Sequence, residues 1–431
     1  MDRTSVRKIT LMCLWAVFSM ALAVSASAKT WNVGPNQAYK TPCSLERAGV
    51  LADGDTVVIA YSPSNGPGIG YYDDTCTWTQ NNLTIVGVLG PGGARPVLNT
   101  AGLTDTPTTG HIAKHDGIWV ISGNNTVVKN LEFENAMVSN AEGANGAGIR
   151  MHGKNLTVLN CYFHDNEDGI LEGNVAGSNI VIKYSEFARN GVSNKALTEG
   201  YGYTHNVYIG HCASLLFAFN YSHDANVGHL LKTRAAINYI LYNRLTGENG
   251  TDSYEIDIPS GGTSYVIGNL IQQGENTLNP IILSYMEEGP NPRNPGRNLY
   301  VVNNTFVNQH TEGGTFVHVD PRANVALLQN NIFDGKGTIT NQTNAVLKTN
   351  YSGSHPMLAG IDNYDYHLRK GSPAINAGSQ PASVNGFSLL PKDQYVHPAC
   401  GQARQLVGVI DIGAYEFGGA GPTLRCRKGR V

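Results

Sequence analysis

One strand pattern recurs along most of this chain, and this repeat limits the possible folds more than any other feature. In segments 126–133, 157–163 and 180–187, alternating apolar residues lead through a polar corner to a closing aromatic residue. Further copies close on Tyr221, Leu245, Ile271, Phe306 and Phe333. The closing residues recur at intervals of 24 to 35 residues. Repeats of this length indicate a solenoid, in which each unit buries its apolar face against the next.

The residues within each repeat favour strands over helices. Apolar and polar residues alternate, which is the period of a half-buried strand. Gly accounts for 50 of the 431 residues and Tyr for 21, while only 15% are charged, so the composition is rich in turn and strand formers. We predict an all-β fold, a right-handed parallel β-helix. Asn side chains that stack from coil to coil at a bend are expected at Asn160, Asn220, Asn243, Asn269, Asn304 and Asn331.

The ends of the chain differ from the repeats. Basic residues at positions 3, 7 and 8 precede an apolar run over 11–24, which ends in the small residues 26–28. This pattern predicts an export signal over residues 1–28, cleaved near Ala28, and a secreted or periplasmic protein. Residues 44–52 have a helical pattern and are expected to cap the first coil. We predict one β-helix domain over 29–417 and a flexible basic tail over 418–431.

The charge balance excludes some partners. Cleavage would remove three of the 30 basic and one of the 33 acidic residues, leaving 27 basic and 32 acidic. A mildly acidic chain lacks the excess of basic residues that is typical of proteins that bind nucleic acids or anionic membrane surfaces. A local basic patch can still hold an acidic polysaccharide, which is the partner that we expect for a monomeric chain.

Six cysteines remain after cleavage, and none has metal-ligand spacing. An even number in an exported protein is compatible with disulfides. We expect Cys43 to pair with Cys76 near the N-terminal cap and Cys400 with Cys426 near the C-terminal end. Cys161 and Cys212 lie within strand patterns, where a buried cysteine acts as a small apolar residue.

A second strand class precedes each closing strand and carries a strip of charged residues at the middle of the chain. Side chains alternate across a strand, so Lys232 and Arg234 should face solvent on one coil, and Glu255 and Asp257 on the next. Both Lys232 to Glu255 and Arg234 to Asp257 span 23 residues, which predicts that these pairs stack. Further polar residues are expected along or beside the same face: Arg150, His152, Tyr203, His205, His223, His229 and Tyr285.

Two interpretations of this strip compete. One is a surface ladder of ion pairs with no further role. The other is cleavage of a uronic-acid polysaccharide by β-elimination, which needs a base for the C5 proton and a positive charge for the carboxylate. Lys232 would be the base, Arg234 would bind the carboxylate, and His205 would be the acid or an alternative base. The residues expected to bind substrate are Arg150, His152, Tyr203, His229 and Tyr285.

A cation site is also expected on this strip. Glu255 and Asp257 can hold Ca²⁺ through hard oxygen ligands, provided that Asp224 or Asn206 joins them.

The blocks 228–235, 238–244, 253–259 and 266–273 resemble bacterial secreted parallel β-helix proteins of the pectate-lyase-like superfamily. The resemblance covers nearly all of the mature sequence and implies the β-helix fold and a carbohydrate-active function. Alginate- and chondroitin-type lyases of this kind use a Lys, an Arg and Ca²⁺, which correspond to Lys232, Arg234, Glu255 and Asp257. In those lyases the Lys and the Arg lie about one coil apart, whereas here both lie on one strand.

Other activities on the same fold stay open. A glycoside hydrolase needs paired acidic residues, and the only adjacent aspartates lie at 73 and 74 in an N-terminal loop. An epimerase shares the proton abstraction of a lyase. A non-catalytic surface or glycan-binding protein is the main alternative from a different class.

Overall fold

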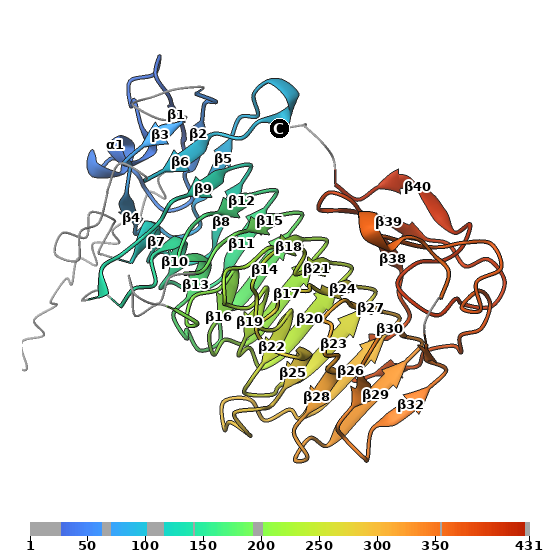
Figure 1. The fold of residues 1–431 in the computed structure, drawn as a ribbon. Helices are drawn as coiled ribbons and strands as arrows, with labels where there is room; N and C mark the ends of the chain where they lie inside the picture. Colours follow the sequence, from blue (N-terminus) through green and yellow to red (C-terminus); the bar gives the residue numbers. More distant parts are fainter. Residues whose placement is uncertain are drawn as a thin grey trace, which may run out of the picture.

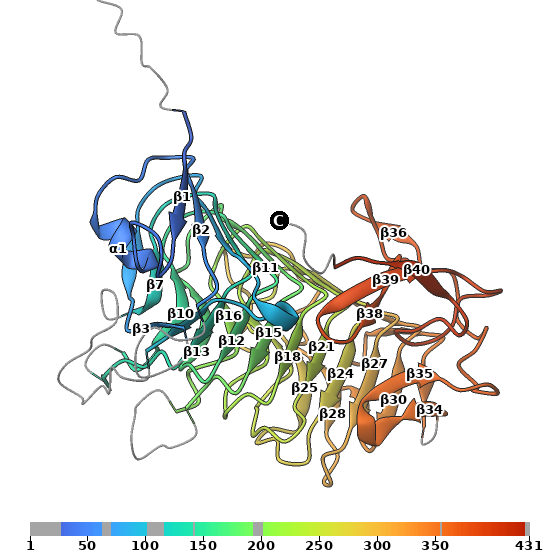
Figure 2. The ribbon, with the colours of Figure 1, turned by 90° about the horizontal axis from the view of Figure 1, so that it is seen from above.

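The computed structural model describes residues 27–62, 70–100, 116–140, 143–192, 201–353 and 356–426. The predicted export signal lies almost entirely outside these residues. Within them, three long parallel sheets stack coil upon coil, as Figures 1 and 2 show from the blue to the orange end. Each coil contributes one strand to each sheet, in the order sheet C, sheet A, sheet B. The predicted parallel β-helix is confirmed.

Sheet A has twelve strands. They are β1 (Thr30–Val33), β2 (Thr56–Ile59), β5 (Thr84–Gly87), β8 (Thr126–Lys129), β11 (Leu156–Leu159), β14 (Asn179–Lys183), β17 (Ser214–Ala218), β20 (Ile237–Leu241), β23 (Thr263–Ile267), β26 (Asn298–Val302), β29 (Val325–Gln329) and β32 (Val346–Lys348).

Sheet B has eleven strands. They are β3 (Tyr71–Tyr72), β6 (Val97–Asn99), β9 (Glu132–Glu134), β12 (Tyr162–His164), β15 (Glu186–Ala188), β18 (Tyr221–His223), β21 (Arg244–Thr246), β24 (Leu270–Gln273), β27 (Thr305–Asn308), β30 (Ile332–Gly335) and β33 (Tyr351–Ser352).

Sheet C has ten strands. They are β4 (Cys76–Trp78), β7 (Gly117–Ile121), β10 (Ala147–Met151), β13 (Asp168–Glu172), β16 (Val207–Ile209), β19 (Lys232–Thr233), β22 (Ile256–Ile258), β25 (Ile281–Tyr285), β28 (Thr315–Val319) and β31 (Thr338–Thr340).

The closing residues of the repeat form the inner face of sheet B. Phe133, Phe163 and Phe187 are fully buried, and their rings stack at centroid distances of 4.9 and 5.1 Å. The strand residues on either side of each Phe therefore point outward. This alternation fixes which side chains of sheet B can reach solvent.

Asn ladders run along the corner between sheets A and B. The Asn243 side chain donates to Asn269 Oδ1 (2.9 Å) and to the Phe217 carbonyl (2.8 Å), and the backbone N–H of Asn220 donates to Asn243 Oδ1 (2.9 Å). The ladder continues through Asn304, Asn331 and Asn350. The predicted inner ladder is confirmed. Asn160 instead stacks on Asn130 in a separate, partly exposed ladder.

The N-terminal end is capped as expected, by a shorter helix. Helix α1 spans Pro42–Arg47 rather than 44–52, because Thr41 caps its first turn and Pro42 occupies its first position. The predicted disulfide between Cys43 and Cys76 joins α1 to β4. No helix in the described ranges is both long and apolar enough to cross a membrane.

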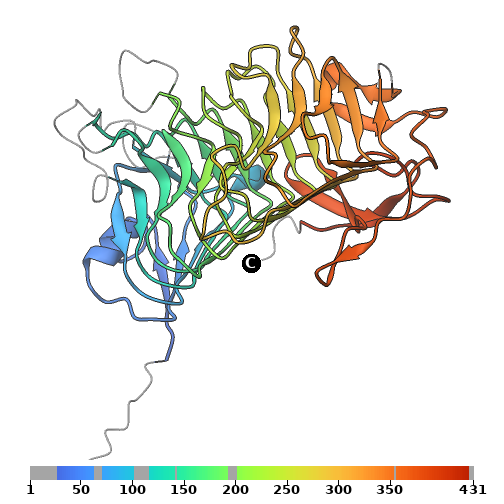
Figure 3. The same cartoon turned by 90° about the horizontal axis from the view of Figure 1, so that it is seen from below.

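The C-terminal end differs from the predicted domain boundaries. After β33, the chain forms antiparallel pairs beside sheet B, seen in red in Figures 1 and 3. The strands are β34 (Leu358–Gly360), β35 (Asp365–Leu368), β36 (Ser383–Val384), β37 (Phe387–Ser388), β38 (Asp393–Val396), β39 (Cys400–Arg404) and β40 (Ala420–Leu424), with a 3₁₀ turn at Ile361–Asn363. We call residues 356–426 the C-terminal unit.

The prediction of a flexible tail is wrong for most of 418–426. Strand β40 pairs with β39, and Cys426 forms the predicted disulfide with Cys400. Backbone pairing and a covalent link hold this segment in the three-stranded sheet. Cys161 and Cys212 are buried free cysteines, as predicted. Two disulfides fit a protein that folds in an oxidising compartment.

Candidate functional site

Lys232 and Asp257 lie side by side on the outer face of sheet C. Their strands β19 and β22 align Lys232 with Asp257, and Tyr208 of β16 aligns with Lys232 on the other side. The predicted pairing of Lys232 with Glu255 is therefore wrong by two residues. Because side chains alternate with a period of two, that shift keeps Lys232 and Asp257 on the same face and changes only which residues are neighbours.

The Lys232 ammonium group is held between an acid and an aromatic ring. Lys232 Nζ is 3.3 Å from Asp257 Oδ2 and 5.7 Å from the centroid of the Tyr208 ring. The Lys232 side chain is 15% exposed, whereas that of Asp257 is 4% exposed. Burial raises the pKa of Asp257 to about 6, although the charge of Lys232 opposes the shift.

Arg234 follows directly after β19 and is bound by three partners. Its Nε donates to Tyr208 Oη and its Nη1 to Ser260 Oγ, both at 2.9 Å. The Glu288 carboxylate accepts from both terminal nitrogens of Arg234, at 2.5 and 2.7 Å. These hydrogen bonds lower the pKa of Glu288. Half of the Glu288 side chain is exposed, so Arg234 lies beneath an acid that solvent can reach.

His205 and His229 form a buried stack at the edge of the same sheet. Their rings are 4.6 Å apart, and the His229 ring is 4.8 Å from that of Tyr254. The backbone N–H of His229 donates to His205 Nδ1 (2.9 Å), and that of Tyr254 donates to His229 Nδ1 (3.1 Å). Each Nδ1 is therefore an acceptor, and the ring proton lies on Nε2. His229 Nε2 is 3.5 Å from Asp257 Oδ2.

This placement argues against His205 as an acid or base. His205 is 2% exposed, and burial, followed by the nearby charges of Lys232 and Arg234, lowers its pKa well below the usual value. The ring accepts a backbone N–H at a coil corner, as the Asn side chains do in their ladder. We assign His205 a structural role.

Among the described residues, Glu255 and Asp257 do not converge with a third ligand as the expected calcium site requires. Glu255 is fully buried beside Asp252, and burial together with the Asp252 charge raises its pKa well above the usual value. It precedes β22, where the chain still turns and strand alternation does not apply. Asp224 and Asn206 also do not join: Asp224 bonds His223, and Asn206 lies in a buried ladder. In the described ranges, no group of three converging ligands includes Glu255 or Asp257.

The residues expected to bind substrate separate into different environments. Tyr285 is fully buried and donates to the Gly262 carbonyl (2.6 Å), so its predicted role is wrong. Tyr203 is 77% exposed, and His152 Nε2 lies 3.1 Å from Asp116. His229 belongs to the buried stack.

Arg150 lies three coils from Lys232 on sheet C, about 14 Å along the axis. Its Nε and Nη1 atoms are buried and have no hydrogen-bond partner in the structure as described.

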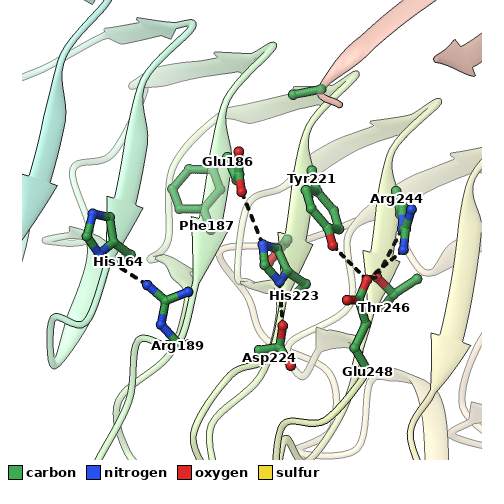
Figure 4. Close-up of polar contacts among 12 residues, drawn as sticks. His164, Glu186, Phe187, Arg189, Tyr221, His223, Asp224, Arg244, Thr246 and Glu248 are labelled. Atoms are coloured by element: carbon green, nitrogen blue, oxygen red, sulfur yellow. Dashed lines mark hydrogen bonds and ion pairs between the residues drawn. The ribbon is translucent and has the colours of Figure 1, made fainter. Parts of the chain in front are cut away.

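A second polar cluster lies on the outer face of sheet B (Figure 4). His223 was predicted to lie beside the strip of sheet C, whereas it lies on β18 of sheet B, and the other residues of this cluster were missed. His164 Nε2 lies 3.1 Å from Glu132 Oε1 and 3.2 Å from Glu134 Oε2, on the adjacent strand β9. Two coils further, His223 Nε2 lies 3.3 Å from Glu186 Oε1. The signal in the sequence is a repeated Tyr-x-His-Asp at 162–165 and 221–224. Tyr-x-His is the closing strand itself, β12 or β18, and the Asp follows it directly. Alternation along this strand turns Tyr and His outward.

The two histidines of this cluster make the same local bond. His164 Nδ1 is 2.6 Å from Asp165 Oδ2, and His223 Nδ1 is 2.6 Å from Asp224 Oδ2. Burial opposes a charged His164, but the hydrogen bonds to Asp165 and Glu132 and the nearby acids outweigh it and raise its pKa to about 9.

Comparisons with known proteins show no family for this chain. No family model matches the sequence, and no curated protein matches it. The chain is similar to the crystal structure of pectate lyase Pel9A, with a TM-score of 0.42 and 12% identity over 90% of this chain and 97% of that one. It is also similar to ORF18 of Geobacillus virus E2, with a TM-score of 0.36 and 14% identity over 71% and 53%. The chain is therefore described by its fold, an all-β parallel β-helix.

Proposed function

We propose that the protein is a polysaccharide lyase that cleaves a uronic-acid-containing chain by β-elimination on the outer face of sheet C. One observation carries the proposal: the partly exposed Lys232 amino group lies between Asp257 and Tyr208, with the Arg234 guanidinium next to it. A base and a positively charged guanidinium side by side match the two groups that β-elimination uses.

In the proposed reaction, the neutral amine of Lys232 removes the proton at C5 of the uronate. The electron pair of that C–H bond forms the C4=C5 double bond, and the C4–O bond breaks. The leaving oxygen takes a proton from water.

Arg234 would hold the substrate carboxylate during this step. Glu288 already places a carboxylate against both terminal nitrogens of Arg234, in the bidentate arrangement that guanidinium favours. Since the Glu288 side chain is half exposed, a uronate carboxylate can replace it. Arg234 stays oriented because Tyr208 and Ser260 bind its other donors. The charge on Arg234 would then stabilise the negative charge that develops as C5 loses its proton.

The test is product formation by the mature chain. Pectate, alginate, glucuronan and glycosaminoglycans are each incubated with the protein, and the unsaturated product is followed by its near-ultraviolet absorbance. We expect Lys232→Ala to reduce the rate on the accepted polymer by about 10²–10⁴-fold, the usual contribution of a positioned base. Lys183→Ala, on the outer face of sheet A, is the matched control and should keep the wild-type rate.

Two results would overturn the lyase proposal. One is a wild-type rate in a folded Lys232→Ala protein. The other is binding of a polymer with no unsaturated product, which would support the non-catalytic glycan-binding alternative. The second outcome has a physical basis, because Lys232 and Arg234 both already have acidic partners.

A further inference from the structure

Glu132, Glu134 and His164 converge on one point of the outer face of sheet B, far from the proposed lyase residues. The strands β9 and β12 align Glu134 with His164, and Glu132 lies two residues earlier on the same side of β9. The three side chains are 22%, 18% and 9% exposed. Two carboxylate oxygens and one imidazole nitrogen therefore meet where one side is open to solvent.

The orientation of His164 is fixed from behind. Its Nδ1 bonds Asp165 Oδ2 at 2.6 Å, and Arg189 holds both oxygens of that carboxylate, at 3.0 and 2.7 Å. With Nδ1–H donated to Asp165, the neutral ring presents the lone pair of Nε2 to the two glutamates. A carboxylate that orients the far nitrogen of a histidine is the usual second shell of a metal ligand.

The glutamates are also placed by neighbours. Asn99 donates to Glu134 Oε1, which leaves Oε2 of the same carboxylate directed at His164. In the neutral tautomer of His164, three acceptor atoms then face one another with no proton between them. Either Nε2 is protonated or a cation lies among the three atoms.

We propose that Glu132, Glu134 and His164 form a site for a divalent transition-metal ion of the zinc class. Ligands about 2.1 Å from such an ion lie about 3.0–3.4 Å from one another. The observed separations from Nε2, 3.1 and 3.2 Å, fall within that range. An imidazole favours zinc-class ions over Ca²⁺ or Mg²⁺, which prefer oxygen ligands alone. Water would complete the coordination on the open side.

The charges of the site fit a divalent ion. Glu132, Glu134 and Asp165 are acidic, Arg189 neutralises one of the three, and a neutral His164 adds no charge. One divalent cation balances the remaining two negative charges.

The neighbouring His223 is the contrasting case within the same fold (Figure 4). It has the same Nδ1 bond, to Asp224, but a single carboxylate faces its Nε2, that of Glu186 at 3.3 Å. Glu248, the other nearby acid, already accepts from Tyr221, Arg244 and Thr246. His223 also converges with Asp224 and Glu248. Glu248, however, forms an ion pair with Arg244 at 2.7 Å, so this second group has less negative charge free for a cation, and His223 supplies the matched control.

The experiment is metal titration of the full mature chain after treatment with chelator. Isothermal titration with Zn²⁺ is expected to show one equivalent that His164→Ala and Glu134→Gln each weaken by at least about 100-fold. Asp165→Asn should weaken it by about 10–100-fold, because it removes only the orienting partner. His223→Ala should keep the wild-type affinity. Co²⁺ gives an independent readout, since its visible absorption should appear in wild type and in His223→Ala and be absent in His164→Ala.

Either of two outcomes would overturn the site. If wild type binds no Zn²⁺ and NMR shows His164 protonated at both nitrogens at neutral pH, the cluster is an imidazolium ion network. If His164→Ala, folded by circular dichroism, binds Zn²⁺ as wild type does, the metal lies elsewhere. Both readouts are independent of polymer cleavage, so failure of the lyase proposal leaves this test intact.

Discussion

At the scale of single residues, His205 and His229 show how a coil corner fixes a protonation state. Both rings accept a backbone N–H at Nδ1 and are buried, and the charge of Lys232 lies nearby. Burial is the main reason that their pKa values are well below the usual value of a histidine. Their neutrality links the stability of the fold to pH.

The sign of that link predicts destabilisation by acid. Below the unfolded pKa of about 6.5, the unfolded chain binds protons that the folded histidines do not bind. The free energy of unfolding then falls by up to about 1.4 kcal/mol per pH unit for each histidine. We expect His205→Asn, whose side-chain oxygen can accept the same N–H, to reduce this slope.

Denaturant unfolding at pH 7 and pH 5 measures the effect. The exposed control His367→Asn should keep the wild-type slope. Equal slopes in wild type and His205→Asn would show that His205 is protonated in the folded state.

Residue orientation could be predicted from the sequence only within strands. Alternation correctly turned Lys232 outward, since Lys232 is partly exposed and the next residue, Thr233, is buried. It failed for Glu255, which precedes β22. Tyr285 was predicted to contact substrate because it is aromatic. At the end of β25, however, its side chain points inward and belongs to the core.

At the scale of elements, the inner Asn ladder holds the corner between sheets A and B. Each Asn side chain is buried and bonds both the next rung and a strand carbonyl. The residue before the ladder Asn takes the left-handed conformation, for example Phe219 (φ 59°) and Tyr242 (φ 55°). This conformation turns the following side chain inward. Stacking of the Tyr184, Phe219 and Tyr242 rings outside the corner helps to offset its cost.

Removal of one ladder rung should therefore be costly. Asn243→Ala leaves the backbone N–H and the side-chain amide of Asn220 without their acceptor, and the Phe217 carbonyl without its donor, in a buried corner. At about 1–3 kcal/mol for each unsatisfied buried group, we expect the free energy of unfolding to fall by about 2–5 kcal/mol.

Denaturant unfolding of Asn243→Ala checks this value. The control is Asn124→Ala, which removes a solvent-exposed rung and should cost less than about 1 kcal/mol. Equal losses in both variants would mean that burial of the ladder does not determine its contribution.

The repeat predicted the coils, but it could not predict which residues of neighbouring coils align. Coil lengths vary because turns of different length join the strands, so equal spacing of 23 residues does not guarantee alignment. The 25 residues from Lys232 to Asp257 make one coil, as the strand pairing shows. Contacts such as Arg234 with Glu288, 54 residues apart, come from the turn after β25, two coils further along the axis. Nothing in the local pattern could indicate them.

At the scale of the whole molecule, the outer face of sheet B changes character along the axis. Near the N-terminal end it carries Glu132, His164 and His223, whereas further along it carries Leu270, Val307 and Ile332. These apolar residues are buried against the C-terminal unit, in a cluster with Leu358, Tyr366, Leu368, Ala374, Tyr395, Ile412, Ala414 and Tyr415. The C-terminal unit therefore buries the apolar coils, and His397 of the same unit also contacts Tyr221 and Arg244 on the polar coils next to them.

Docking of the C-terminal unit should consequently depend on the apolar outward positions of sheet B. Val307 is 2% exposed within this cluster. Val307→Asp would bury an unpaired carboxylate there or force the two surfaces apart. Because the coils beneath retain their own core, we expect the C-terminal unit to detach while the β-helix stays folded.

Limited proteolysis distinguishes these states. Val307→Asp should release a fragment cut between β33 and β34 at least about 10-fold faster than wild type, with little change in far-ultraviolet circular dichroism. Val346→Asp is the control, since Val346 is 56% exposed on the last strand of sheet A, and its cleavage rate should equal that of wild type. Global unfolding of Val307→Asp, with cleavage throughout the coils, would show instead that the C-terminal unit and the β-helix fold as one cooperative body. The C-terminal unit would then not be an independently unfolding part, and its docking could not change without unfolding the coils.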